Sequence, residues 1–137
     1  MKKIYTALIM VLSLNATELP SYHCVNTYEA SFIEADGSIK PKANKASGRS
    51  KLNIMVEEGK NKKLFLNVNG NKLLVTDIKH GYIYAVEFTA GGMHTWVLFE
   101  NKKDKKTYLT ISKTYDFLGA PLTSYSLYNC EQVNNGF

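Results

Sequence analysis

The chain has 137 residues, of which 45% are hydrophobic and 21% charged, and its formal net charge is +5 at pH 7. This length allows one domain, and the composition is that of a folded globular protein rather than a disordered or fibrous one. All basic residues except Arg49 are lysines. Lysine lacks the planar fork with which arginine recognises phosphates and bases, so the charge does not indicate a nucleic-acid-binding protein.

The first sixteen residues have the pattern of a secretory signal peptide. Lys2 and Lys3 form a positively charged start, and an apolar run from Ile4 to Leu14 follows. That run is too short to cross a bilayer, which takes about 20 residues, but it suits the apolar part of a signal peptide. We therefore expect residues 1–16 to be cleaved off and residues 17–137 to form a single exported domain, periplasmic or secreted. Loss of the two lysines lowers the formal charge to +3.

The cysteine content agrees with export. There are two cysteines, Cys24 and Cys130, and oxidising compartments allow a disulfide to persist. Each follows a tyrosine by two residues, Tyr22 and Tyr128, so that each Tyr–Cys pair shares one face of an extended strand. We predict a disulfide that joins the two ends of the mature domain.

From residue 21 onward the chain reads as short strands with alternating apolar residues. The first expected strand is 21–33. Residues 34–49 contain Asp36-Gly37, Pro41 and Gly48 without apolar periodicity, which predicts a turn and a long mobile loop. Seven further strands are expected at 52–56, 64–68, 72–78, 82–88, 93–100, 106–114 and 122–131. Asn69-Gly70 is the strongest turn signal among them, because both positions of the tight hairpin turn need positive φ.

Eight strands joined by tight turns predict an all-β antiparallel meander that forms a closed or nearly closed barrel. A two-sheet sandwich is the alternative, since strand counting does not distinguish the two. In a meander with an even number of strands, the first and last strands run antiparallel. A bond between Cys24 and Cys130 would then lock the seam of the barrel. Residues 115–121, with Asp116, Gly119 and Pro121, are predicted to interrupt the last two strands.

The sequence carries no enzyme motif. It has no glycine-rich phosphate loop, no Gly-x-Ser-x-Gly elbow and no His-Glu-x-x-His pair. A cysteine nucleophile needs a free thiolate, and both cysteines are expected to be bonded. Asp77, His80 and His94 fit no known metal-ligand spacing. We therefore expect a non-enzymatic protein with no catalytic residues, metal site or cofactor.

Two kinds of binding remain as hypotheses. In the first, a small apolar or amphipathic ligand lies in the mouth of the barrel, because several strands are apolar on both faces. The residues expected to line that site are Tyr82, Tyr84, Phe88, Trp96 and Phe99. In the second, the protein is an interaction module of the cell envelope, such as a hydrolase inhibitor or an assembly factor. It would then act through residues 34–49 or 115–121, since exposed loops commonly carry function.

Overall fold

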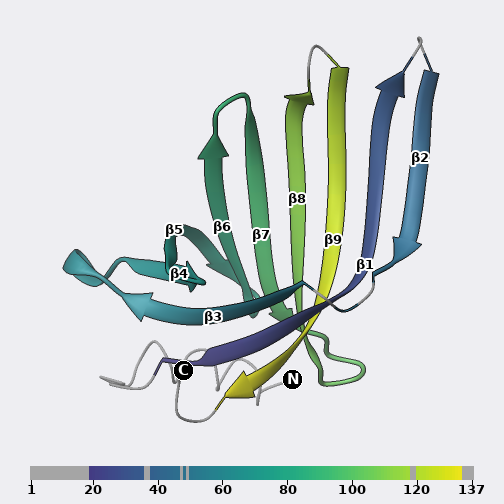
Figure 1. The fold of residues 1–137 in the computed structure, drawn as a ribbon. Helices are drawn as coiled ribbons and strands as arrows, with labels where there is room; N and C mark the ends of the chain where they lie inside the picture. The colour runs from purple at the N-terminus through teal and green to yellow at the C-terminus, as the bar shows by residue number, and fades with distance from the viewer. Residues whose placement is uncertain (1–18, 36–37, 47, 49, 118–119, 134–137) are drawn as a thin grey trace.

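The computed structural model describes residues 19–35, 38–46, 48, 50–117 and 120–133. The expected signal peptide, residues 1–16, lies outside the described residues. The chain forms antiparallel strands over most of the described length (Figure 1). They are β1 (Ser21–Ala35), β2 (Ser38–Lys45), β3 (Lys51–Glu58), β4 (Leu64–Val68), β5 (Asn71–Lys79), β6 (Tyr82–Thr89), β7 (Gly92–Glu100), β8 (Thr107–Phe117) and β9 (Ala120–Val133), with a short 3-10 helix, η1 (Lys60–Lys62), before β4. Within these ranges, no helix is long and apolar enough to cross a membrane.

The predicted barrel is confirmed, and the sandwich is not formed. The strands follow one another in the order β1-β3-β4-β5-β6-β7-β8-β9, and β9 pairs with β1 to close an eight-stranded ring. Strand β2 is an addition, paired only with β1. Each neighbouring pair is antiparallel, as a meander with short turns requires.

Two predictions about the connections were wrong. Residues 34–49 were expected to be loop, but Ser38–Lys45 form β2, which pairs with β1 from Tyr28↔Lys45 to Ala35↔Ser38. This strand has no apolar alternation because it covers no core, and Pro41 and charged residues are typical of an edge strand. Residues 115–121 were expected to interrupt the strands, but β8 and β9 continue through this segment and pair up to Phe117↔Ala120.

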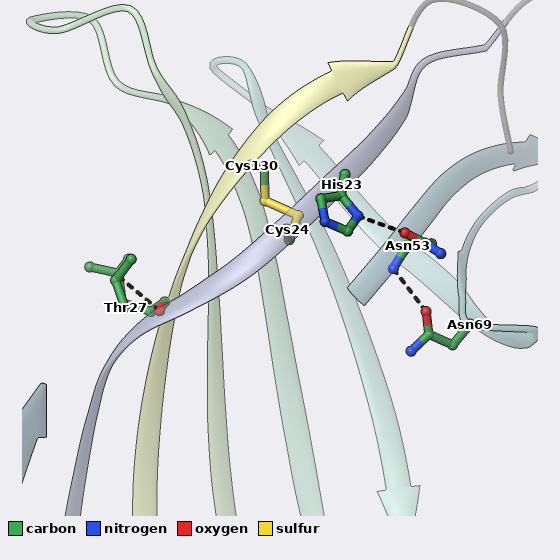
Figure 2. The surroundings of a disulfide bond; sticks show 7 residues. His23, Cys24, Thr27, Asn53, Asn69 and Cys130 are labelled. Carbon is green, nitrogen blue, oxygen red and sulfur yellow. Dashed lines mark hydrogen bonds between the residues drawn. A yellow bond between two sulfur atoms is a disulfide. The ribbon is translucent and has the colours of Figure 1, made fainter. Parts of the chain in front are cut away.

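Strand β1 is shared between a closed and an open part of the sheet. Its first residues, from Ser21 to Val25, pair with β3, whereas its second half pairs with β2. The change occurs at Thr27, where the register with β9 shifts in a bulge, and the Thr27 Oγ1 donates a hydrogen bond to the Leu127 carbonyl at 3.1 Å (Figure 2). A bulge of this kind bends a strand and strengthens its twist.

Beyond the bulge the sheet is no longer closed. On the far side β5 pairs with β6 only between Lys79↔Tyr82 and Val75↔Ala85, so the rest of β6 has β7 as its partner. Six strands, in the order β2-β1-β9-β8-β7-β6, therefore continue past the closed barrel, whereas β3, β4 and β5 belong only to the closed part (Figure 1). We call this extension the open half-sheet; it comprises residues 28–35, 38–45, 86–89, 92–96, 111–117 and 120–127.

The closed part of the barrel is filled by its own side chains. Inward-facing apolar residues from every barrel strand form one cluster, in which Ile54, Leu66 and Leu109 have no exposed surface. The predicted disulfide is confirmed: Cys24 pairs with Cys130 across the β1–β9 seam and the bond lies in the same core (Figure 2). An eight-stranded barrel has an interior just wide enough for side chains, as here.

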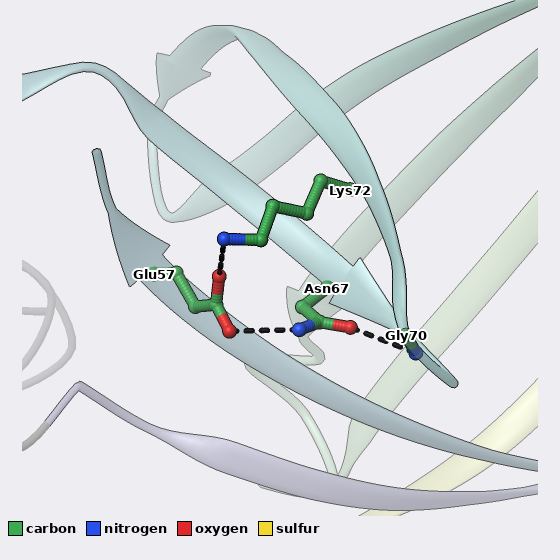
Figure 3. A network of polar contacts seen from close by, with 4 residues as sticks. All are labelled: Glu57, Asn67, Gly70 and Lys72. Carbon is green, nitrogen blue, oxygen red and sulfur yellow. Dashed lines mark hydrogen bonds and ion pairs between the residues drawn. The ribbon is translucent and has the colours of Figure 1, made fainter. Parts of the chain in front are cut away.

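The β4–β5 hairpin has the turn that the sequence predicted. Asn69 and Gly70 both have positive φ, 47° and 94°. The side chain of Asn67 accepts a hydrogen bond from the Gly70 amide at 2.9 Å and donates one to Glu57 on β3 at 2.7 Å (Figure 3). Glu57 also forms an ion pair with Lys72 at 2.9 Å. These bonds from Asn67 and Lys72 hold the pKa of the Glu57 carboxyl below its ordinary value.

Candidate functional site

The open half-sheet presents two chemically different faces. Successive side chains of a strand point to opposite sides, and antiparallel partners point to the same side. Because Cys24 and Cys130 face the barrel core, the pairings identify every side chain that continues this inner face beyond the barrel. The inner face of the extension carries a row of polar residues, whereas its outer face carries exposed aromatic residues.

On the inner face, pairing across all six strands places one polar residue of each strand in a single row. Ser31 is opposite both Lys42 and Ser124, Ser124 is opposite Lys113, and the row continues over β7 and β6. In strand order the row consists of Lys42, Ser31, Ser124, Lys113, His94 and Glu87. We call it the polar row. At its β6 end the His94 Nδ1 and a Glu87 carboxylate oxygen are 2.9 Å apart.

Two adjoining hollows lie along the polar row. The first has a volume of about 260 Å³ and the second about 340 Å³, and they share Lys113 and Tyr115 as lining residues. The first is lined by Glu29, Ser31, Lys42, Asn44, Lys113, Tyr115, Ser124 and Ser126, together with Ala30 and Tyr125 between them. The second reaches His94, Thr89 and Ala90. Their volumes are near the lower end of the range of small-ligand pockets, about 300–1,000 Å³.

The outer face of the open half-sheet is rich in exposed apolar groups. Among the described residues, six large hydrophobic side chains are exposed, and all but Leu74 belong to this face. They are Tyr28, Phe32, Phe88, Met93 and Tyr125, and Phe88 is the most exposed at 81%. Soluble proteins rarely leave apolar groups gathered on one face unless something binds there.

The residues predicted to line a ligand site do not share a face. Tyr82 is opposite Phe99, and Phe88 is opposite Met93, which places these side chains on the outer face. Tyr84 lies on the same side, two residues after Tyr82, and the Tyr82 and Phe99 rings stack with centroids 5.1 Å apart. Trp96 is opposite Ala85 and faces inward, with 8% of its surface exposed. The placement therefore does not fit a common lining of the barrel mouth, because four of the five rings are outside.

The histidines considered as metal ligands are also separated. Asp77 is opposite Tyr84 on the outer face, whereas His94 faces inward and contacts Glu87. His80 lies in the β5–β6 turn with a positive φ of 55°. In the part of the chain that the structure describes, no three His, Cys, Asp or Glu side chains come together as metal ligands.

Sequence reasoning missed the polar row and its hollows. A polar residue at every second strand position normally means a solvated outer face, and nothing local distinguishes it from the inner wall of an open extension. Only the register across four strands reveals that Lys42 and Lys113, 71 positions apart in the chain, belong to one surface. Because the sequence did not predict β2, which carries Lys42, the row could not be inferred from the sequence.

Barrels of this size serve unrelated functions, so the fold alone does not determine what the protein does. A search of models of known protein families finds no match to this chain, and neither does a search of curated proteins. The two faces of the open half-sheet, one with the polar row and one with exposed aromatic residues, are therefore the features that indicate function.

Proposed function

We propose that this protein is an exported, non-enzymatic interaction module that binds a protein partner through the outer face of its open half-sheet. The observation that carries this proposal is the concentration of exposed apolar side chains on that face, among them Phe88, Tyr28 and Tyr125. Aromatic residues and methionine are enriched at the centres of protein interfaces, where their burial supplies most of the binding free energy.

The filled barrel supports a partner rather than a ligand in the lumen. Apolar side chains occupy the closed part, and the large ring of Trp96 lies opposite the small side chain of Ala85. Four of the five aromatic residues expected to hold a ligand, all except Trp96, lie on the outside instead. There Tyr82, Tyr84, Phe99 and Tyr108 form a series of ring contacts. They would extend the same interaction surface down the outside of the barrel.

Export is part of this proposal. The disulfide between Cys24 and Cys130 fits an oxidising compartment, as does the signal-peptide pattern of residues 1–16. A hydrolase inhibitor or an assembly factor of the cell envelope would be an interaction module of the kind that we propose. The edge strand β2 favours contact through the face of the sheet, because Pro41 and its lysines oppose strand addition at that edge.

Affinity capture from the envelope of the protein's own host tests the proposal. The double variant Phe88→Ser/Tyr125→Ser changes two exposed residues of the outer face, and Leu74→Ser changes an exposed residue of β5 outside the open half-sheet. We expect the wild type and the Leu74 variant to retain the same partner, and the double variant to lose it at least tenfold. Equal capture by all three proteins would contradict the proposal, and so would exclusive binding to protein-free lipid vesicles.

A further inference from the structure

The polar row and its hollows are on the opposite face from the proposed partner surface, and they have a chemistry of their own. The first hollow is bounded by two ammonium groups, from Lys42 and Lys113, and by one carboxylate, from Glu29. Hydroxyl and amide groups of small side chains surround them, from Ser31, Ser124, Ser126 and Asn44. This set offers both donors and acceptors, with an excess of positive charge.

Neither lysine of the hollow has an ion-pair partner among the described residues. In the described residues, the ion pairs are those of Glu57 with Lys72 and of Glu87 with His94, so Lys42 and Lys113 have no acidic partner. Lys113 is half-buried and lines both hollows. An ammonium group without a counter-charge can bind an anion, and a hydrogen bond between charged groups is stronger than a neutral one.

Unsatisfied polar groups lie directly beneath the polar row. The next row toward the core contains Glu29, Ser126, Ile111 and Trp96. The buried Trp96 Nε1 has no hydrogen-bond partner among the described residues, and an unpaired buried donor is costly. Asn26, one row lower, donates to Glu29 Oε1 at 2.9 Å, while its own buried oxygen is likewise unpaired. Neither Trp96 nor Asn26 lines the hollows themselves, so these two groups mark the boundary between the apolar core and the polar row.

The place of the site on the sheet helps to identify the occupant. Sheets generally bind peptides at an edge, through main-chain hydrogen bonds, whereas this hollow lies on the face of the sheet, where only side chains are presented. Apolar side chains are scarce in its lining, apart from the ring of Tyr115 and the interleaved Ala30 and Tyr125, so an apolar ligand is not favoured. Lys42 and Lys113 are three strands apart, about 14 Å at the usual strand spacing, which is longer than a single sugar ring.

We propose that the inner face of the open half-sheet binds an acidic oligosaccharide. Lys113, shared by both hollows, would hold a carboxylate of the sugar, and Lys42 would contact the same or a neighbouring acidic ring. The serines, Asn44 and Glu29 would exchange hydrogen bonds with sugar hydroxyls, and the Tyr115 ring would lie beside a pyranose. The site and the partner surface lie on opposite faces of the same strands, and they share one bordering residue, Tyr125.

Titration of the disulfide-bonded, isotope-labelled protein with a trigalacturonate, followed by NMR, tests this proposal. Three comparison probes are a neutral galactose trisaccharide, triglutamate and inorganic phosphate. We expect the trigalacturonate to shift amide signals of Ser31, Lys113 and Ser124 and to bind at least tenfold more tightly than each comparison probe. Higher salt should weaken its binding, since the contact is ionic.

Matched variants decide whether the polar row is responsible. Lys113→Gln should raise the dissociation constant about tenfold or more, as expected when a charged hydrogen bond is lost. Lys103→Gln removes the same charge from the β7–β8 turn and should change it less than twofold, and Lys113→Arg, which keeps the charge, should retain much of the binding. Thermal unfolding curves verify that each variant is folded.

Several results would overturn the proposal. These are the absence of any binding, signal shifts outside the open half-sheet, or no effect of Lys113→Gln in a folded protein. Equal affinity for the neutral sugar would exclude recognition of the acid group. Equal affinity for triglutamate or phosphate would show a general anion site without sugar recognition.

Discussion

Removal of the Cys24–Cys130 bond tests how the seam of the barrel is stabilised. The bond joins residues 106 positions apart, and it restricts the unfolded chain as well as the folded one. The chain-entropy relation gives about 4.7 kcal/mol for a closed loop of 100 residues, and measured losses in small secreted domains are about 2–5 kcal/mol. Since domains of this size have a total unfolding free energy of about 5–15 kcal/mol, a large fraction of the stability should depend on this one bond.

The fold itself should survive the change. Strands β1 and β9 pair on both sides of the cysteines, from Ser21↔Val133 to Ile33↔Leu122, so the ladder remains when the bond is gone. We expect the variant Cys24→Ala/Cys130→Ala to unfold in one cooperative transition, with the unfolding free energy lowered by about 2–5 kcal/mol. Urea titration measures this loss, and fluorescence of Trp96, the single tryptophan, reports on the core.

Two results would refute this reasoning. A loss below about 1 kcal/mol would mean that the bond hardly restricts the unfolded chain. Complete unfolding in the absence of urea would mean that the β1–β9 pairing forms only when the bond is present. Reduction of the wild-type protein under native conditions provides a second route to the same state and should give the same loss.

Three further substitutions test the packing, the sheet pairing and the polar contacts. Leu109→Ala removes a fully buried side chain and should lower the unfolding free energy, measured in urea, by about 2–5 kcal/mol. Leu74→Ala, at an exposed site, should lower it by less than about 1 kcal/mol, and similar losses from both variants would contradict the assignment of the core. Gly92→Ala should lower the melting temperature, because its methyl group would come within 2.5 Å of the carbonyl oxygen of Thr114 on the neighbouring strand and overpacking costs about 1–3 kcal/mol. An unchanged melting temperature would show that β7 and β8 can move apart at this position. Glu57→Gln should lower the unfolding free energy by up to about 1 kcal/mol at pH 7, and this loss should disappear as the pH falls through the pKa of the folded carboxyl. Urea unfolding measures the loss, and an equal loss above and below that pKa would contradict the prediction.

The direction of the Glu57 effect follows from its lowered pKa. Asn67 and Lys72 bind the ionised carboxylate, so the folded protein holds the charged form more strongly than the unfolded chain does. The stabilisation is therefore present above the ordinary carboxyl pKa and is lost as the pH falls through the folded value. The side chains of Glu57 and Lys72 are 28% and 61% exposed, and solvent screening keeps the effect small.

The features that were predicted correctly have a signal in short stretches of sequence or in the two cysteines near the ends of the domain. Alternation of apolar residues identified the barrel strands, and Asn69-Gly70 identified a hairpin whose two φ values are positive. The disulfide followed from the even cysteine count in a chain with a signal-peptide pattern. Strand β2 has no such signal, because its backbone is paired with the edge of β1 while its side chains at Ser38 and 41–45 are exposed.

Strand β6 is apolar on both faces, so its sequence alone did not distinguish the inward face from the outward one. Tyr82, Tyr84 and Phe88 were expected to line a ligand site, yet the smaller residues Ile83 and Ala85 face the core. The ring of Trp96 already occupies the space opposite Ala85, so a second ring there would overfill a narrow lumen. Such complementarity between neighbouring strands is visible only when their register is known.

The most direct test of the central claim, that the outer face of the open half-sheet binds a protein, is photo-crosslinking in the living host. A photoreactive phenylalanine derivative replaces Phe88 in one variant and Leu74 in another; both side chains are exposed, but only Phe88 belongs to the open half-sheet. We expect a discrete crosslinked species of defined mass from position 88 and none from position 74. Absence of a crosslink at position 88, or the same species from both positions, would contradict it.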